Sequence, residues 1–446
     1  MLPDSRHPRL TMHFPTDACA VVRPSVERAL RTFAARLAIT LPALFALPHV
    51  LAAQSGDSAA AAPPFRCMDT TATTIPARLD ARHLIYVEQE TVVAHPDGRI
   101  LVAGSPVFVW RESDLGRHEM LKADSLFGMV IDSTSSAVRA IPSPLPGRSL
   151  DGVRAAALPD GWWLVTFAEV SPRQMPKHPI VKRMWAGETD GTHWRELRML
   201  PVVGDSLDPT KMSNLAWRDG RARLAVQYPH DGWTYAAMYS LDRGVWSART
   251  ENLRLTNYID FSLSPTHDLM AIVRPSEDGP ADINSLYLFA KRAEDSVWTN
   301  KAWIVVGDKS PVYEPRFTGD SARVLSWLRE DGASWDAWFA NVDARGDSVG
   351  RIHHLSRGAI EAASASRGAN HVWAIHDRGR PTATLRVIES GGSPALASRI
   401  TATDYAGLIG VAIARNRVVV VASRPSSSPR APDVISVIHS YPWRCP

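Results

Sequence analysis

Short hydrophobic segments separated by polar turns recur along the chain after residue 85, with little of the 3.6-residue period that helices require. One unit returns as a short strand, a polar turn of two to five residues and a more hydrophobic strand. Its copies are Thr91–Gly104, Arg154–Glu169, Asn214–Tyr228, Asp260–Arg274, Glu314–Arg329, Glu361–Asp377 and Gly410–Ser423. Three turns contain Asp-Gly, at Asp97-Gly98, Asp160-Gly161 and Asp219-Gly220, which supplies the positive φ of tight hairpins. The pattern predicts an all-β fold.

A second, looser strand pair follows most of these hairpins. Examples are Thr234–Asp242, Leu286–Ala290, Asp336–Val342 and Thr384–Glu389. Four strands in about every 45–60 residues is the spacing of β-propeller blades. We therefore expect a single β-propeller of seven four-stranded blades, with six or eight blades, a sandwich pair or two domains as alternatives.

Closure of the ring needs a strand from the other end of the chain. The segment Leu84–Glu90 is expected to lie beside Val434–Ile438 and complete the last blade. Such closure removes exposed strand edges.

The N-terminal segment differs from the rest of the chain. Arginines between Arg23 and Arg36 precede the uncharged run Leu37–Leu51, and Ala52-Ala53 before Gln54 is typical of a cleavage site. The run is short for a bilayer-spanning helix of roughly 20 residues, although a transmembrane anchor is the alternative. We expect a signal peptide over 1–53, a flexible spacer over 54–66 and the propeller over 67–446. The mature protein is then periplasmic or secreted, with no membrane span.

Charge changes this picture in one respect. The formal net charge is +4, but residues beyond 53 carry 44 basic and 43 acidic side chains. A nucleic-acid-binding surface needs a basic excess, so nucleic acid is not an expected partner. All 15 Trp lie beyond residue 100, which indicates aromatic packing or a binding surface. We expect a monomer.

Cysteine usage points to a single cross-link. Cys19 belongs to the leader, and Cys67 and Cys445 stand near the two ends of the mature chain. An oxidising compartment permits a disulfide between them, and a ring architecture would bring them together. A loop of this length stabilises the fold by roughly 5 kcal/mol in the chain-entropy treatment. Two unrelated buried thiols are the alternative.

Two stretches resemble known propeller repeats. Leu158–Val170 followed by Val181–Leu200 resembles a blade of the sialidase-like, Asp-box (BNR) propellers, with Thr189–Trp194 and Ser240–Trp246 as shortened Asp-box turns. In such a turn the Asp accepts backbone N–H bonds and the Trp packs under neighbouring strands, so the resemblance implies a fold and no catalysis.

Ser264–Ala290 and Glu314–Asp343 are similar to TolB-type propeller repeats. Together the two resemblances cover about a third of the chain. They imply architecture more than activity, because fold does not fix function.

The sialidase site is incomplete in this sequence. Sialidases use three arginines, a Tyr/Glu pair and an Asp acid/base. Arg154 stands where the family's first-blade Arg-Ile-Pro motif falls, but Ala155-Ala156 follow it. Arg173 matches the arginine after the family's Phe-Ala-Glu strand, yet Ser171–Gly187 contains no carboxylate. The catalytic residues are therefore not identified.

Polar residues at the expected starts of the inner strands form the candidate ligand-binding rim. They are Arg154, Asn214, Asp260, Glu314, Arg316, Glu361 and Tyr405. Paired carboxylates there could cleave glycosidic bonds, while the alternative is a hydrated channel mouth that satisfies strand ends. The histidines lack zinc-ligand spacing and no nucleotide motif occurs, so we expect no metal and no cofactor.

These observations favour an exported, non-catalytic propeller that binds a protein or glycan partner through one face. Candidate contacts are Arg183, Trp185, Trp233, Trp335 and Trp338. The alternative is a sialidase-superfamily-like glycoside hydrolase with its site at the channel mouth.

Overall fold

The computed structural model describes residues 66–445 with gaps. The gaps are 89, 106, 113–117, 123–124, 136, 172–180, 202, 204–206, 231–232, 256–257, 276–283, 296, 305–311, 319–322, 332–333, 378–381, 390–393, 401–406 and 426–433. The chain divides into two units, Met1–Ala59 and Ala60–Pro446, and every described residue belongs to the second. The predicted leader, its cleavage site and Tyr405 lie outside the described residues. No helix within the described ranges is long and apolar enough to cross a membrane.

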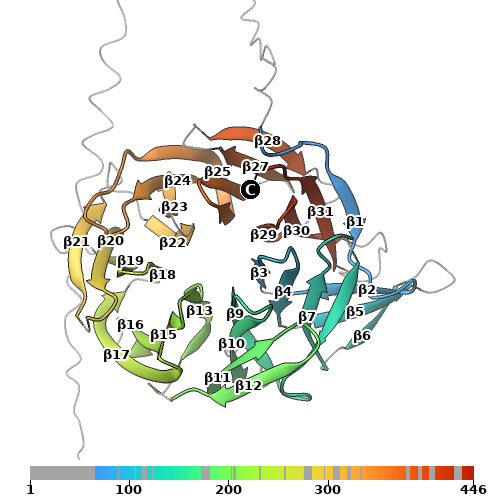
Figure 1. Ribbon diagram of the computed structural model, residues 1–446, viewed down its shortest axis with the longest axis horizontal. Helices are drawn as coiled ribbons and strands as arrows, with labels where there is room; N and C mark the ends of the chain where they lie inside the picture. The colour runs from blue at the N-terminus through green and yellow to red at the C-terminus, as the bar shows by residue number, and fades with distance from the viewer. Residues whose placement is uncertain are drawn as a thin grey trace, which may run out of the picture. The chain divides into compact units, whose positions relative to one another are not determined.

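Seven antiparallel sheets of four strands stand around a common axis, so the second unit is a seven-bladed propeller, as predicted (Figure 1). From the axis outward, the first four blades are β3 (Glu90–Ala94), β4 (Ile100–Gly104), β7 (Leu126–Ile131), β8 (Val138–Pro142); β9 (Leu150–Ala157), β10 (Trp163–Val170), β11 (Val181–Thr189), β12 (Trp194–Met199); β13 (Asp208–Met212) with β14 (Ala216–Arg218), β15 (Arg221–His230), β16 (Trp233–Asp242), β17 (Val245–Leu255); and β18 (Tyr258–Leu263), β19 (His267–Pro275), β20 (Asn284–Arg292), β21 (Thr299–Ile304).

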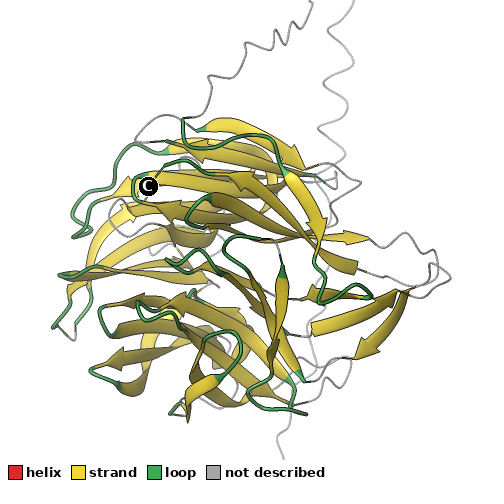
Figure 2. Cartoon of the chain, turned by 45° about the vertical axis from the view of Figure 1, so that its right-hand side comes forward, coloured by secondary structure: helices red, strands yellow, loops and turns green. Residues whose placement is uncertain are grey.

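Of the last three blades, the fifth and the sixth share one long strand. The three blades are β22 (Val312–Thr318), β23 (Arg323–Asp331), β24 (Ser334–Val342) and the start of β25 (His353–Arg367); the end of β25, β26 (Asn370–Asp377), β27 (Ala383–Ile388), β28 (Ala395–Ile400); and β29 (Gly407–Ile413), β30 (Arg417–Pro425), β31 (Val434–Pro442), β1 (Thr73–Pro76). The strand β25 pairs with β24 up to Ala359 and with β26 from there on. Figure 2 shows strands joined by loops throughout the described part.

The seven predicted hairpins are the seven inner strand pairs. Their second strands are mainly apolar in their middle segments because neighbouring blades cover both faces of each sheet. Residues Val418–Val421 of β30 are fully buried, and β10 is buried from end to end. At the third hairpin Asp219 and Gly220 both have positive φ, 49° and 76°, as the Asp-Gly turn predicted.

The closing strand is not the predicted one. Thr73–Pro76 pairs with β31, with Thr73 opposite Ser440, and completes the last blade. The prediction for Leu84–Glu90 is wrong, since β2 (His83–Val87) pairs instead with β5 (Val107–Glu112), which pairs with β6 (His118–Lys122). Leu84 still packs against Ile435 and Val437 of β31, so the three-stranded sheet β2-β5-β6 lies against the last blade. A short, polar strand such as Thr73–Pro76 has little hydrophobic pattern by which to recognise it.

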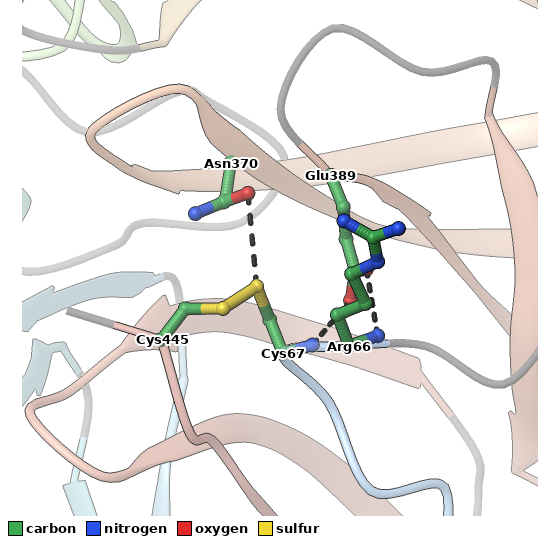
Figure 3. The surroundings of a disulfide bond; sticks show 5 residues. All are labelled: Arg66, Cys67, Asn370, Glu389 and Cys445. Atoms are coloured by element: carbon green, nitrogen blue, oxygen red, sulfur yellow. Dashed lines mark hydrogen bonds between the residues drawn. A yellow bond between two sulfur atoms is a disulfide. The ribbon is translucent and has the colours of Figure 1, made fainter.

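The terminal disulfide is confirmed. Cys67 and Cys445 are bonded across 378 residues, with their Cα atoms 4.8 Å apart. Oε1 of Glu389 accepts a hydrogen bond from Cys67 N at 2.8 Å, and its Oε2 accepts one from Arg66 N at 2.8 Å (Figure 3). Asn370 Oδ1 lies 3.9 Å from Cys67 Sγ, which is a contact only, because a disulfide sulfur has no proton to donate. The bond therefore fixes the N-terminal segment to the last two blades.

Arginines at the beginning of second strands join consecutive blades. Arg99 donates to Gly161 O at 2.7 Å and to Asp190 O at 2.9 Å in the next blade. Arg221 likewise donates to Ser264 O and, at 2.5 Å, to Asp268 Oδ1, and Arg417 donates to Ser135 O at 3.1 Å across the junction of the last and first blades. Each arginine thus satisfies loop carbonyls that strand pairing leaves open.

The Asp-box-like turn at Thr189–Trp194 has the structural role that its resemblance implied. Asp190 Oδ1 accepts hydrogen bonds from the backbone N–H groups of Thr192 and His193, both at 2.7 Å. The Trp194 ring packs edge-on against Phe127 at 5.1 Å. In the turn Ser240–Trp246 the carboxylate of Asp242 instead accepts hydrogen bonds from Arg223.

Candidate functional site

Two adjoining pockets occupy the axis of the propeller. The pocket nearer the beginnings of the inner strands has a volume of about 440 Å³, and we call it the start-side pocket. The pocket at their ends has a volume of about 720 Å³, and we call it the end-side pocket. Both are lined by Val93, Ala155, Asn214, Leu215 and Phe317, so they meet midway along the axis.

The start-side pocket gathers five of the seven predicted site residues. They are Arg154, Asn214, Glu314, Arg316 and Glu361. The inner strands begin earlier than the sequence indicated, as in β9, which starts at Leu150 instead of Arg154. The five side chains consequently line the pocket within the channel rather than its outer rim. They come from four different blades.

Asp260 does not line this pocket, because it is fully buried behind it. Its carboxylate accepts hydrogen bonds from Asn214 N at 3.0 Å and Phe317 N at 2.8 Å. Burial raises the pKa of Asp260, while the charge of Arg316 and these N–H donors oppose that effect. Asp260 therefore acts as a support that ties the third and fifth blades to the fourth.

Arg154 has a structural task besides lining the pocket. Its Nε donates to Ser213 O at 3.1 Å and its Nη2 donates to Met212 O at 3.2 Å, both in the next blade. Arg316 Nη1 donates to Asn214 Oδ1 at 3.3 Å. These bonds hold both guanidinium groups in place before any ligand arrives, and such preorganisation favours binding.

Glu314 holds an unusual backbone conformation. Its φ is +49°, within a bulge of β22 where the register with β23 shifts between Tyr313 and Arg316. A left-handed conformation costs a non-glycine residue about 1–2 kcal/mol. Bulges redirect side chains and are frequent beside functional sites. Of the four described non-glycine residues with positive φ, Glu314 alone lies on an inner strand.

Glu361 lies where its charge is disfavoured. Desolvation raises its pKa to about 7, with a further contribution from Glu314 and an opposing one from Arg316. Water reaches the side chain inside the channel, but the surrounding blades crowd the carboxyl group and solvate it less than an outer surface would. Glu361 therefore retains its proton to a higher pH than an ordinary glutamate.

An aromatic cluster adjoins Glu314. Tyr313 stacks on Trp335 at 5.2 Å between ring centroids and meets Tyr258 edge-on at 6.0 Å. Burial raises the pKa of Tyr258, and the charge of Glu314 raises it further. All three rings are partly exposed.

The other predicted contacts are dispersed. Trp338 packs edge-on against His354 at 4.8 Å, and Trp185 donates to buried Glu169 at 3.3 Å. Arg183 is exposed on β11, and the side chain of Trp233 lies outside the described part. Within the described ranges, no group of three or more His, Cys, Asp or Glu side chains is placed to hold a metal ion.

The end-side pocket contains charged residues that the sequence did not single out. Arg218, Arg367 and Arg415 line it, together with Asp219 and the buried His95. These arginines come from the turns and strand ends of three blades. A pattern that could have identified them is the basic residue at the tip of three inner hairpins.

Several solved structures resemble this chain at low sequence identity. A protein of unknown function from Dyadobacter fermentans DSM 18053 is 8% identical, with a TM-score of 0.44 over 83% of this chain and 98% of that chain. The NanB sialidase from Streptococcus pneumoniae is 9% identical, with a TM-score of 0.43 over 84% and 97% of the two chains.

The six-bladed Aleuria aurantia lectin is 13% identical, with a TM-score of 0.41 over 73% and 98% of the chains. No protein-family model matches the sequence, and neither does any curated protein. The solved structures that resemble this chain thus include lectins and glycoside hydrolases or lyases, all at low identity and with TM-scores below 0.5.

Proposed function

We propose that the protein binds a saccharide in the start-side pocket. The proposal rests on the convergence of five polar side chains from four blades on one pocket of about 440 Å³. This volume lies in the range of small-molecule sites. Sugar hydroxyls donate and accept hydrogen bonds. Carboxylates accept them, guanidinium groups donate them and an amide does both, so the set Glu314, Arg316, Asn214 suits such a ligand.

Apolar surface in the same pocket supports this choice. Val92, Leu215, Phe317 and Val411 line it between the polar groups and offer contact to the C–H faces of a sugar ring. A protein partner would need roughly 800 Å² of surface on each side, which a recessed pocket of this size does not provide. The geometry thus favours a glycan over a protein.

We also infer that the protein is exported. The disulfide between Cys67 and Cys445 is compatible with an oxidising compartment outside the cytoplasm. The arginine-rich, apolar leader predicted over 1–53 would direct the chain there.

A second candidate function is glycoside hydrolysis, and one observation favours it. Glu361, with a pKa of about 7, shares the pocket with Glu314. A carboxylic acid that retains its proton near neutral pH can protonate a glycosidic oxygen, while a second carboxylate activates water or attacks the sugar. The same pocket would then bind and cleave its ligand.

One experiment separates the two functions. The protein is screened on a glycan array and against a panel of nitrophenyl glycosides, with Glu361→Gln, Glu314→Gln and, as a control, Glu294→Gln on an exposed outer turn. Binding without turnover supports the saccharide-binding proposal. Turnover that Glu361→Gln abolishes and Glu294→Gln preserves establishes the hydrolase. Absence of binding to every glycan refutes both.

A further inference from the structure

The two ends of the channel differ in charge. The start-side pocket has two arginines and two glutamates in its lining, which balance each other. Among the described residues, the lining of the end-side pocket has three arginines and a single carboxylate, that of Asp219. A recessed surface with excess positive charge concentrates the field and attracts anions.

The one carboxylate neutralises little of this charge. Asp219 Oδ2 lies 3.4 Å from Arg218 Nε, but the Asp219 side chain is 67% exposed. Ion pairs so open to solvent are worth about 0–1 kcal/mol. Among the described residues, no carboxylate lies within 4.0 Å of the guanidinium of Arg367 or Arg415. Two of the three cations therefore lack an ionic partner within the described part of the protein.

Backbone contacts hold Arg367 and Arg415 near one another. Arg367 Nη1 donates to Ala414 O at 3.1 Å and to Arg415 O at 2.5 Å, which ties the sixth blade to the tip of the seventh. A Cβ added at Gly98 would lie 3.5 Å from Arg415 Cβ, so Arg415 stands beside the hairpin tip of the first blade. Its position is thus fixed from both sides.

From these observations we propose that the end-side pocket, lined by Arg218, Arg367 and Arg415, binds an oxyanion group, a carboxylate, sulfate or phosphate. Planar guanidinium groups match the geometry of oxyanions and bind them with paired hydrogen bonds. Ala94, Ala156 and Ile413 also line the pocket, and they leave room beside the arginines for the small body of a ligand that carries the group. This site is independent of the saccharide proposal, because it uses other residues and the opposite end of the channel.

The test is a calorimetric titration of the full chain with sodium sulfate, inorganic phosphate and D-glucuronate at constant ionic strength. We expect saturable binding of at least one of them, and their ranking distinguishes an inorganic ion from a saccharide carboxylate. Arg415→Gln should weaken that binding at least tenfold. The matched control Arg351→Gln removes an exposed charge outside the channel and should leave the affinity within twofold.

Two results would overturn the proposal. One is the absence of saturable binding with all three anions. The other is equal affinity of the wild type and Arg415→Gln, with thermal melting used to show that both are folded. Glu361→Gln should bind the anion as the wild type does. Loss of binding in that variant would place the anion in the start-side pocket and likewise contradict the proposal.

Discussion

Removal of the disulfide between Cys67 and Cys445 should lower stability without changing the fold. The bond closes a loop with a sequence separation of 378 residues. According to the chain-entropy relation, the disulfide lowers the entropy of the unfolded state by about 20 cal/mol/K, which corresponds to about 6 kcal/mol of stability at 25 °C. With about 2.1 cal/mol/K of unfolding entropy per residue over roughly 380 residues, the melting temperature should fall by about 7 °C.

The native contacts around the bond explain why the fold should persist. Arg444 N donates to Cys67 O at 2.7 Å and Asp69 N donates to Pro442 O at 2.9 Å, and neither bond involves sulfur. The pairing of β1 with β31 also remains. Because these contacts remain when the disulfide is removed, the loss of stability comes mainly from the greater entropy of the unfolded chain.

The assay is scanning calorimetry of Cys67→Ser/Cys445→Ser in a Cys19→Ser background. The control is Cys19→Ser alone, with and without reductant, and a thiol titration confirms the redox state. A melting temperature within 2 °C of the control would refute the loop-entropy argument. Loss of the β-type circular dichroism spectrum at 25 °C would show that the bond maintains the ring itself.

Three further predictions concern buried and crowded residues. Asp268 is fully buried and forms ion pairs with Arg221 and Arg223, so Asp268→Asn removes their charged partner. The free energy of unfolding, measured with urea, should fall by about 3–5 kcal/mol. An unfolding midpoint equal to that of the wild type would contradict the ion-pair argument. Gly191→Ala should cost about 2–4 kcal/mol, because φ there is +89° and the new Cβ would lie 2.4 Å from Val130 Cγ2; a cost below 1 kcal/mol would count against this geometry. The pKa of Glu361 is higher in the folded protein than in the unfolded chain. This difference stabilises the fold fully when the pH is below the pKa in the unfolded chain, and the contribution is lost as the pH rises through about 7. Glu361→Gln should therefore raise the melting temperature at pH 8 and change it little at pH 5, and the same shift at both pH values would disprove the assignment.

Sequence and structure agree on what local interactions determine. The seven inner hairpins follow from alternating strands and turn residues that lie within about 15 positions of one another. Asp219-Gly220 adopts the positive φ of a tight hairpin without help from distant residues. The disulfide could be predicted because only two cysteines remain once Cys19 is assigned to the leader.

Long-range packing decided the rest. The closing strand Thr73–Pro76 is defined by its register with β31, some 365 residues away, and has little pattern of its own. Hydrophobicity and spacing placed Asp260 on the rim, but its hydrogen bonds to Asn214 and Phe317 place it behind the pocket.

The chemistry of the channel depends on the ring as a whole. The pKa of Glu361 is raised because the surrounding blades desolvate its carboxyl group and because the ring brings Glu314, 47 positions earlier in the sequence, to the same pocket. Arg218 and Arg415 are ordinary turn arginines in the sequence, and they line a common pocket only in the tertiary structure. The chain itself determines strands and turns through local interactions, and its cysteine count indicates the cross-link. The charge and burial of the two pockets arise only when seven blades enclose a common axis, since pKa values and ion pairing depend on neighbours that strand patterns do not identify.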